Sequence, residues 1–100
     1  MKLFISQPMR DKTNEEIERE RQNAIQSVKE KFGEEVEVID SFFKDAPHDA
    51  KPLWYLGKSL MLLSTADVAF FCKGWDEYRG CRIENQCAIE YGIAVIEDYK

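Results

Sequence analysis

The sequence predicts an α/β domain in which helices flank a parallel sheet in three layers. Two short segments, Ala66–Cys72 and Gly92–Glu97, are almost wholly apolar, as strands buried on both faces should be. Strand-like and helix-like segments alternate along the chain, the pattern of right-handed βαβ crossovers. We therefore expect a single domain over residues 1–100 with four parallel strands, or five, in the flavodoxin-like or Rossmann-like order 2-1-3-4.

The N-terminal third predicts a strand followed by an amphipathic helix. Lys2–Ser6 is a short apolar run, and Pro8 ends it because proline cannot donate to a sheet ladder. Thr13 precedes Glu16 by three residues, the spacing of a capping box at a helix N-terminus. Gly33 is placed to end this helix in a left-handed C-cap. The apolar residues that share one stripe of the helix are Ile17, Ala24, Ile25, Val28 and Phe32.

The middle of the chain predicts a second strand, a loop and a second helix. Glu35–Asp40 contains three β-branched residues and suits a strand, whereas Ser41–Asp49 lacks periodicity and suits a loop. Leucines at three- and four-residue spacing predict a helix over about Lys51–Ser64, with Gly57 as a weak point inside it. The leucines that set this spacing are Leu53, Leu56, Leu60 and Leu63.

The last third predicts two buried strands joined through a loop and a helix. A polar loop, Lys73–Arg79, follows the strand Ala66–Cys72. A helix over Arg82–Tyr91 then leads into the last strand. Ligands bind parallel sheets beyond the carboxyl ends of the strands. Three loops should meet there, namely Gln7–Thr13, Ser41–Asp49 and Lys73–Gly80.

Charge and composition narrow the classes of ligand. A net charge of -5 and a pI near 4.9 argue against binding to a nucleic acid polymer, although one basic pocket can still hold a small phosphorylated ligand. The apolar runs are too short to cross a membrane. The three cysteines lack zinc-site spacing, so we expect reduced thiols in a cytoplasmic protein. Neither a metal nor a cofactor is expected, since no ligand cluster or phosphate-binding glycine motif is present.

Glu84 is the strongest candidate for chemistry. We expect Gly80 to open the third helix, which places Glu84 in its first turn, where unpaired amides and the helix dipole favour a negative charge. A carboxylate fixed at this sheet edge suits a nucleophile for an electron-poor sugar carbon. The alternative is an ordinary first-turn glutamate that stabilises its helix. Cys81 also falls at this N-terminus, where a thiol pKa can fall, but His48, the only histidine, is distant in sequence.

The last third of the chain contains the strand ADVAFF, the glycine four residues before Glu84, the following helix and the strand GIAVI. Together they resemble the nucleoside 2-deoxyribosyltransferase superfamily. The opening ISQPM and the acidic, arginine-rich helix after it resemble a small branch of that superfamily, the DUF4406 proteins. The specific part of the resemblance covers residues 3–9 and 66–95. It implies that Glu84 attacks the anomeric carbon of a nucleoside or nucleotide, that the base leaves, and that the sugar passes to another base or to water.

Three positions depart from the pattern of that superfamily. Ser59 and Tyr78 stand where the transferases carry aspartates, and Gln7 stands where many relatives have glycine. Without a proton donor the base must leave as an anion, which is slow. We expect Asp76 or Glu77 to supply the acid from a nearby position.

The expected ligand is a small nucleoside or nucleotide, held by residues of the three loops. The candidates for binding are Ser6, Gln7, Pro8, Met9, Arg10, Phe42, Trp75, Gly80, Cys81 and Arg82. Arg10, Lys12 and Arg82 would hold a phosphate if they converge, and otherwise are solvated surface cations. Trp75 and Phe42 or Phe43 would either stack on a base or pack at a subunit interface.

Three functions remain open on the sequence alone: an enzyme acting on N-glycosidic bonds, a binding module that lost its acid, and a structural interaction protein. A homodimer or higher homo-oligomer is expected, because a chain of 100 residues has difficulty enclosing a ligand by itself. The candidate contact surface is the second helix, through Leu53, Trp54, Leu60 and Met61.

Overall fold

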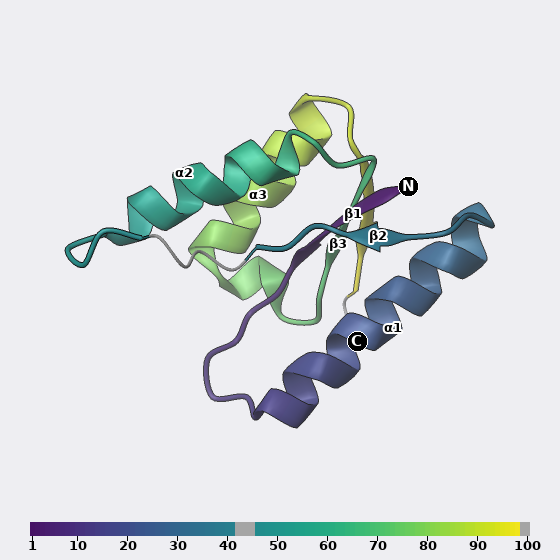
Figure 1. Cartoon of the computed structure of the whole chain (residues 1–100), viewed down its shortest axis with the longest axis horizontal. Helices are drawn as coiled ribbons and strands as arrows, with labels where there is room; N and C mark the ends of the chain where they lie inside the picture. Colours follow the sequence, from purple (N-terminus) through teal and green to yellow (C-terminus); the bar gives the residue numbers. More distant parts are fainter. Residues whose placement is uncertain (42–45, 99–100) are drawn as a thin grey trace.

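The computed structural model of the chain describes residues 1–41 and 46–98. Strands and helices alternate along it (Figure 1). The elements are β1 (Lys2–Ser6), α1 (Asn14–Phe32), β2 (Glu37–Val38), α2 (Pro52–Leu63), β3 (Val68–Phe71), a 3₁₀ helix (Trp75–Glu77), α3 (Arg79–Glu90) and β4 (Ala94–Glu97). Phe42 and Phe43, predicted to stack on a base or to pack at a subunit interface, lie outside the described residues.

The sheet confirms the predicted topology. Its four strands are all parallel and lie in the order β2-β1-β3-β4, with no fifth strand in the described part of the chain. β1 pairs with β3 from Leu3 opposite Val68 to Ser6 opposite Phe71. The strand order reverses between β1 and β3, so a ligand site is expected beyond Ser6.

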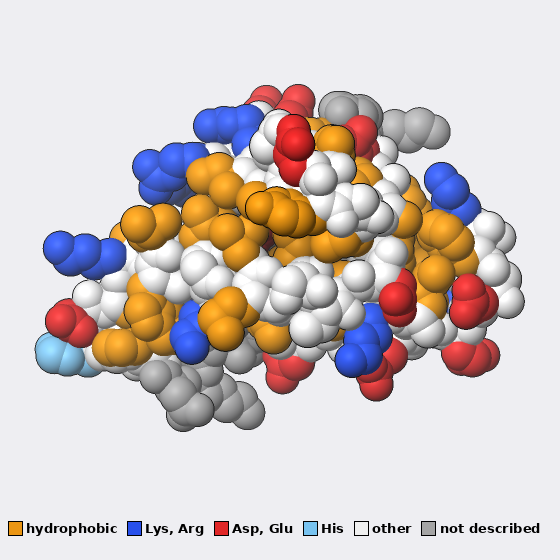
Figure 2. Space-filling view, turned by 90° about the horizontal axis from the view of Figure 1, so that it is seen from above, with side chains coloured by type: hydrophobic (Ala, Val, Ile, Leu, Met, Phe, Trp, Pro, Cys, Tyr) orange, Lys and Arg blue, Asp and Glu red, His pale blue; other side chains and the backbone are white. Residues whose placement is uncertain are grey.

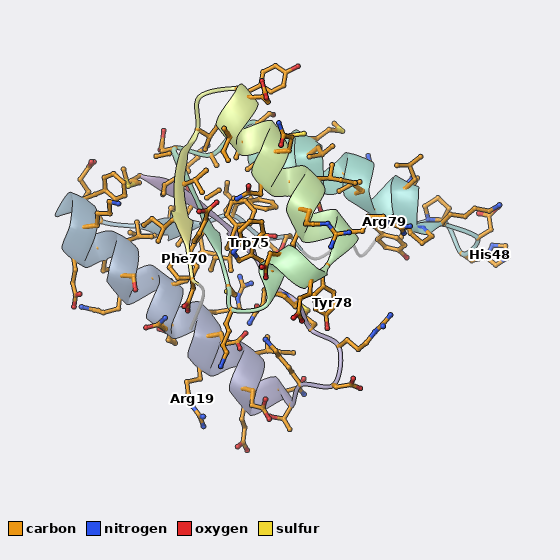
Figure 3. The ribbon with its side chains drawn as sticks, turned by 180° about the vertical axis from the view of Figure 1, so that it is seen from behind. Arg19, His48, Phe70, Trp75, Tyr78 and Arg79 are labelled. Atoms are coloured by element: carbon orange, nitrogen blue, oxygen red, sulfur yellow. The ribbon has the colours of Figure 1, made fainter. Side chains whose placement is uncertain are left out.

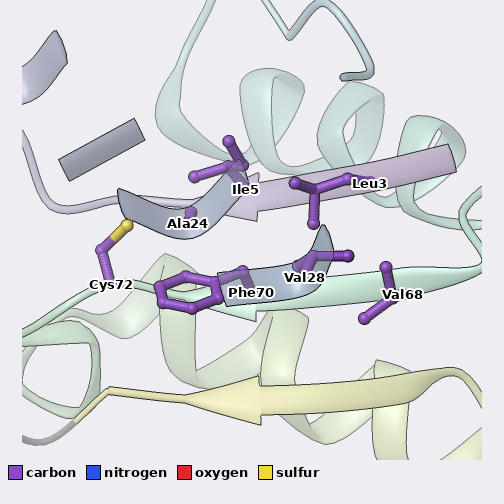
Figure 4. Packing of buried hydrophobic residues seen from close by; sticks show 7 residues of the cluster. All are labelled: Leu3, Ile5, Ala24, Val28, Val68, Phe70 and Cys72. Atoms are coloured by element: carbon purple, nitrogen blue, oxygen red, sulfur yellow. The ribbon is translucent and has the colours of Figure 1, made fainter. Parts of the chain in front are cut away.

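The helices cover the sheet on both faces, which makes three layers. In Figure 1, α1 lies on one face, and α2 and α3 lie together on the other. Successive strand residues point to opposite faces, so each strand contributes to two cores. The core beneath α1 contains Leu3, Ile5, Ala24, Val28, Val68, Phe70 and Cys72 (Figure 4). The core beneath α2 and α3 contains Phe4, Leu63, Ala69, Phe71, Trp75, Cys81 and Ala88.

Two predicted boundaries were wrong. β2 covers only Glu37–Val38, because the described residues beyond Val38 make one further backbone bond to β1, from Ile39 to Leu3, and then leave the sheet. α3 begins at Arg79, three residues earlier than expected, because the Tyr78 carbonyl already accepts the first helical hydrogen bond, from the Arg82 amide. Glu84 is therefore the sixth residue of α3 and does not lie in its first turn.

Candidate functional site

A pocket of about 380 Å³ opens at the carboxyl end of β1, between α2 and α3. β1 and the residues after it form its floor, α2 forms one wall, and the N-terminal part of α3 forms the other. The lining residues are Phe4, Ile5, Ser6, Gln7, Met9, Ser41, Pro52, Tyr55, Leu56, Ser59, Gly80, Cys81 and Glu84. This is the sheet edge at which the sequence predicts a ligand site.

Glu84 is a buried carboxylate in the wall of this pocket. Only 8% of the residue is exposed, and the Ser6 hydroxyl donates a hydrogen bond of 2.7 Å to its Oε1 atom. Burial raises the pKa of Glu84 above its ordinary value of 4.5, and hydrogen bonding to the Ser6 and Ser59 hydroxyls opposes that rise. The carboxylate is thus fixed in direction and only partly solvated, as a positioned nucleophile needs to be.

The N-terminal turn of α3 contributes backbone to the pocket. Gly80 and Cys81 belong to that turn and line the pocket beside Glu84. Amides at the start of a helix have no partner within it, so the positive end of the α3 dipole lies at the pocket wall. The dipole therefore favours a negative group on a ligand near Gly80 more than it favours the charge of Glu84 itself.

Cys81 does not have the lowered pKa that its helix-terminal position suggested. The residue is 8% exposed, and burial raises the pKa of its thiol, with hydrogen bonding to Ser6 acting in the opposite direction. Desolvation outweighs the helix terminus here because the charged thiolate is the form that burial penalises. Cys81 therefore enters the site as a neutral thiol beside Ser6.

Gln7 is held in place by α1. Its Nε2 atom donates to the Ile17 carbonyl and to the Glu20 carboxylate, each at 2.9 Å, and Lys12 pairs with the same carboxylate at 2.8 Å. Both amide hydrogens are therefore used, which fixes the orientation of the side chain. The Oε1 atom of Gln7 has no hydrogen-bond partner among the described residues and is buried.

Several predicted site residues lie away from the pocket. Trp75 is buried in the core, where its ring packs on Phe71 with centroids 5.5 Å apart, so it is not placed to stack on a ligand in this pocket (Figure 3). Pro8 is buried and lines a different hollow, together with Lys12 and Gly74.

The two predicted acids are also outside the pocket. Asp76 and Glu77 are exposed on the 3₁₀ helix, and neither is among the residues that line the pocket. Arg82 points toward this turn and donates to the Asp76 carbonyl at 3.1 Å. Arg10 lines an adjacent hollow with Glu77, Tyr78, Arg79 and Gly80, which touches the pocket only through Gly80. His48 lies at the tip of the loop before α2, far from Trp75 and Tyr78 (Figure 3).

The α2 wall was missed by the sequence reading. Tyr55, Leu56 and Ser59 line the pocket, and the Tyr55 residue is 41% exposed. Ser59 was noted only as the place of a missing aspartate, and that position was the one signal in the sequence for a pocket residue on α2. The leucine spacing of α2 predicted a helix with an apolar packing surface and gave no indication of a pocket wall.

The described residues contain no group of three or more His, Cys, Asp or Glu side chains arranged to hold a metal ion. All three cysteines are free thiols. Within 1–41 and 46–98, no helix is long and apolar enough to span a membrane.

The chain matches no protein-family model, no curated protein and no solved structure.

Proposed function

We propose that the protein cleaves or exchanges the N-glycosidic bond of a small nucleoside or nucleotide, with Glu84 as the nucleophile. The observation that carries the proposal is a buried carboxylate, oriented by the Ser6 hydroxyl at 2.7 Å, in the wall of an open pocket. The volume of about 380 Å³ falls in the range of small-molecule sites, roughly 300–1,000 Å³. The family resemblance centred on Glu84 supplies the reaction class.

In the proposed reaction, a carboxylate oxygen of Glu84 forms a bond to the anomeric carbon. The bond from that carbon to the base nitrogen breaks, and its electron pair leaves with the base. A water molecule or a second base then displaces the carboxylate and takes the sugar; when water attacks, it loses its proton to the medium. The Ser6 hydroxyl holds Oε1 of Glu84, and Ser59 also bonds to this carboxylate, so the nucleophile is oriented within the pocket before a substrate enters.

Proton transfer to the leaving base decides which substrates react. Glu84 is the one carboxylate among the described residues that line the pocket; the other groups with exchangeable protons there include Ser6, Ser59, Tyr55 and Cys81. Hydroxyl and thiol groups are weak acids at neutral pH. We therefore expect preference for bases that leave as weakly basic anions or that take their proton from solvent.

Two features suit the remaining parts of a nucleotide. Tyr55 presents an exposed ring on the α2 wall and replaces Trp75 as the candidate for stacking on a base. Arg10 and Arg79 line the adjacent hollow next to Gly80, where guanidinium groups and the start of α3 favour a phosphate.

The first test is chromatography of purified protein after incubation with ribo- and deoxyribonucleosides and their 5′-monophosphates. We expect free base from at least one of them with the wild type and none above background with Glu84→Gln, which keeps the shape and the acceptor for Ser6 but loses the nucleophile. Glu90→Gln, an exposed change on the same helix, is the matched control and should release base like the wild type. Equal release by Glu84→Gln and wild type would contradict the proposed role of Glu84.

A second candidate is a binding module that keeps the pocket without turnover, favoured by the positions of Asp76 and Glu77 outside it. Ser59→Asp separates the two, because it adds an acid to the α2 wall; general acid help is worth about 10²–10⁴-fold. For a slow enzyme we expect Ser59→Asp to release base faster than Ser59→Asn, which has the same size and polarity but supplies no acid. If the wild type binds a nucleotide but neither it nor Ser59→Asp releases base, the binding module is the better description.

A further inference from the structure

The outer face of α2 exposes large apolar side chains. Leu53, near the start of α2, is 76% exposed, and Met61, in its last turn, is 64% exposed; the helix contains no Asp or Glu. Figure 2 views the molecule from the side on which α2 lies in Figure 1, and hydrophobic side chains spread over that part of the surface. A monomer gains nothing from this exposure, since each exposed apolar side chain forgoes its burial free energy.

The apolar residues are arranged symmetrically about Gly57. Leu53 and Met61 are four residues before and after it, and Trp54 and Leu60 are three residues before and after it. Residues three and four apart share one face of a helix, so these five form a single stripe. Leu53, Gly57 and Met61 are exposed, whereas Leu60, at the edge of the stripe, also packs against the core beneath α2 and α3. If a second copy of α2 lies antiparallel across the stripe, Leu53 of one copy meets Met61 of the other, and Trp54 meets Leu60. Such self-complementarity is what a two-fold contact requires.

Neither the packing nor the backbone conformation of its own chain requires glycine at position 57. A Cβ atom built at this position meets nothing within 4 Å, and its backbone is helical, so alanine would fit. Glycine inside an exposed helix is a poorer helix former than alanine. Its absent side chain does allow a second helix backbone to approach closely at the centre of the stripe.

The chain exposes more surface than a compact monomer of its mass does. A compact monomer of this mass exposes about 5,900 Å² by the area–mass relation of monomeric proteins. This chain of 11.7 kDa exposes 6744 Å². The excess of roughly 850 Å² is comparable to the area that one partner buries in an interface of standard size.

We infer that two copies of this chain pair through α2, antiparallel and crossing at Gly57. Lys58 lies to the side of the contact, where its ammonium sits 5.5 Å from the centre of the Trp54 ring. The opposite side of α2 lines the pocket through Tyr55 and Ser59. Pairing therefore holds the pocket wall in place, whichever ligand the pocket takes.

The experiment is sedimentation velocity of the full chain over micromolar concentrations, with three variants. We expect the wild type to dimerise, and Met61→Glu and Gly57→Leu to raise the dimer dissociation constant by at least about tenfold. Ile89→Glu is the matched control, because Ile89 is an exposed apolar residue of α3, outside the stripe, and this variant should dimerise like the wild type.

Gly57→Leu keeps the test decisive even if the charged variant folds poorly. Leucine is the better helix former, so it should raise the melting temperature of the monomer while it weakens the dimer. A wild type that stays monomeric throughout, or a dimer that survives both Met61→Glu and Gly57→Leu, overturns the inference.

Discussion

Glu84 lies in surroundings that oppose its own charge. Burial raises the pKa of this carboxyl above 4.5, so the folded chain holds the proton to a higher pH than the unfolded chain does. The stability contributed by the protonated form is complete below about pH 4.5 and is lost as the pH rises through the raised folded value. The candidate nucleophile is thus maintained at the expense of stability at neutral pH.

This linkage predicts the behaviour of Glu84→Gln. The variant carries no ionisable group at the site, so it should melt at a higher temperature than the wild type at neutral pH. The difference should shrink as the pH falls through the raised folded pKa of Glu84 and level off below about 4.5, where the carboxyl is neutral in both the folded and the unfolded chain. Differential scanning calorimetry across the pH range measures both.

Glu90→Gln is again the control, because Glu90 is exposed on the same helix. Its melting temperature should follow the wild type at every pH. A Glu84→Gln variant that is less stable than the wild type at neutral pH would show that the hydrogen bond from Ser6 to the ionised carboxylate outweighs its desolvation.

Residue-level features were predictable where they depend on near neighbours in sequence. Ser6 and Glu84 were each proposed for the site, but their hydrogen bond joins residues 78 positions apart, and only the sheet register and the packing of α3 bring them together. The burial of Trp75 has the same cause, since a polar loop gives no sign that one of its rings turns back onto Phe71.

At the scale of elements, α1 was predicted well because its end signals are local. The Thr13 side chain accepts from the Glu16 amide at 3.1 Å, and Gly33 adopts φ 66° while its amide bonds to the Lys29 carbonyl. α3 lacks such a cap: the residue at its N-cap position is Tyr78, which is extended and makes no side-chain hydrogen bond to the helix. Gly80 suggested a later start, whereas the helix includes it in the first turn.

The two faces of α2 lie in different surroundings. The leucine periodicity therefore located the helix but did not predict which face is buried. Its inner face lines the pocket and reaches the core through Leu63, while its outer face carries the apolar stripe around Gly57. Leucine spacing locates a helix but does not distinguish a core contact from a contact with another subunit. The exposed fractions of Leu53 and Met61 make that distinction.

At the scale of the molecule, the parallel sheet was predictable from the alternation of strands and helices, since parallel crossovers have one favoured hand. One sheet serves two separate cores, so the layers depend on the same strands. Leu3 and Ile5 face α1, and Phe4 between them faces α2 and α3. A loss of packing on either side should therefore weaken the whole domain.

This coupling predicts that the layers unfold together. Both tryptophans belong to the side of α2 and α3, whereas α1, with 19 residues, is the longest contributor to far-ultraviolet circular dichroism. Urea transitions followed by tryptophan fluorescence and by circular dichroism should coincide.

Val28→Ala, which removes buried methyl groups beneath α1, should lower the free energy of unfolding by about 1.5–3 kcal/mol and shift both transitions equally. Gln26→Ala, an exposed change on the same helix, should shift neither by more than about 0.5 kcal/mol. If Val28→Ala moves only the circular dichroism transition, α1 unfolds separately and the sheet does not couple the two layers.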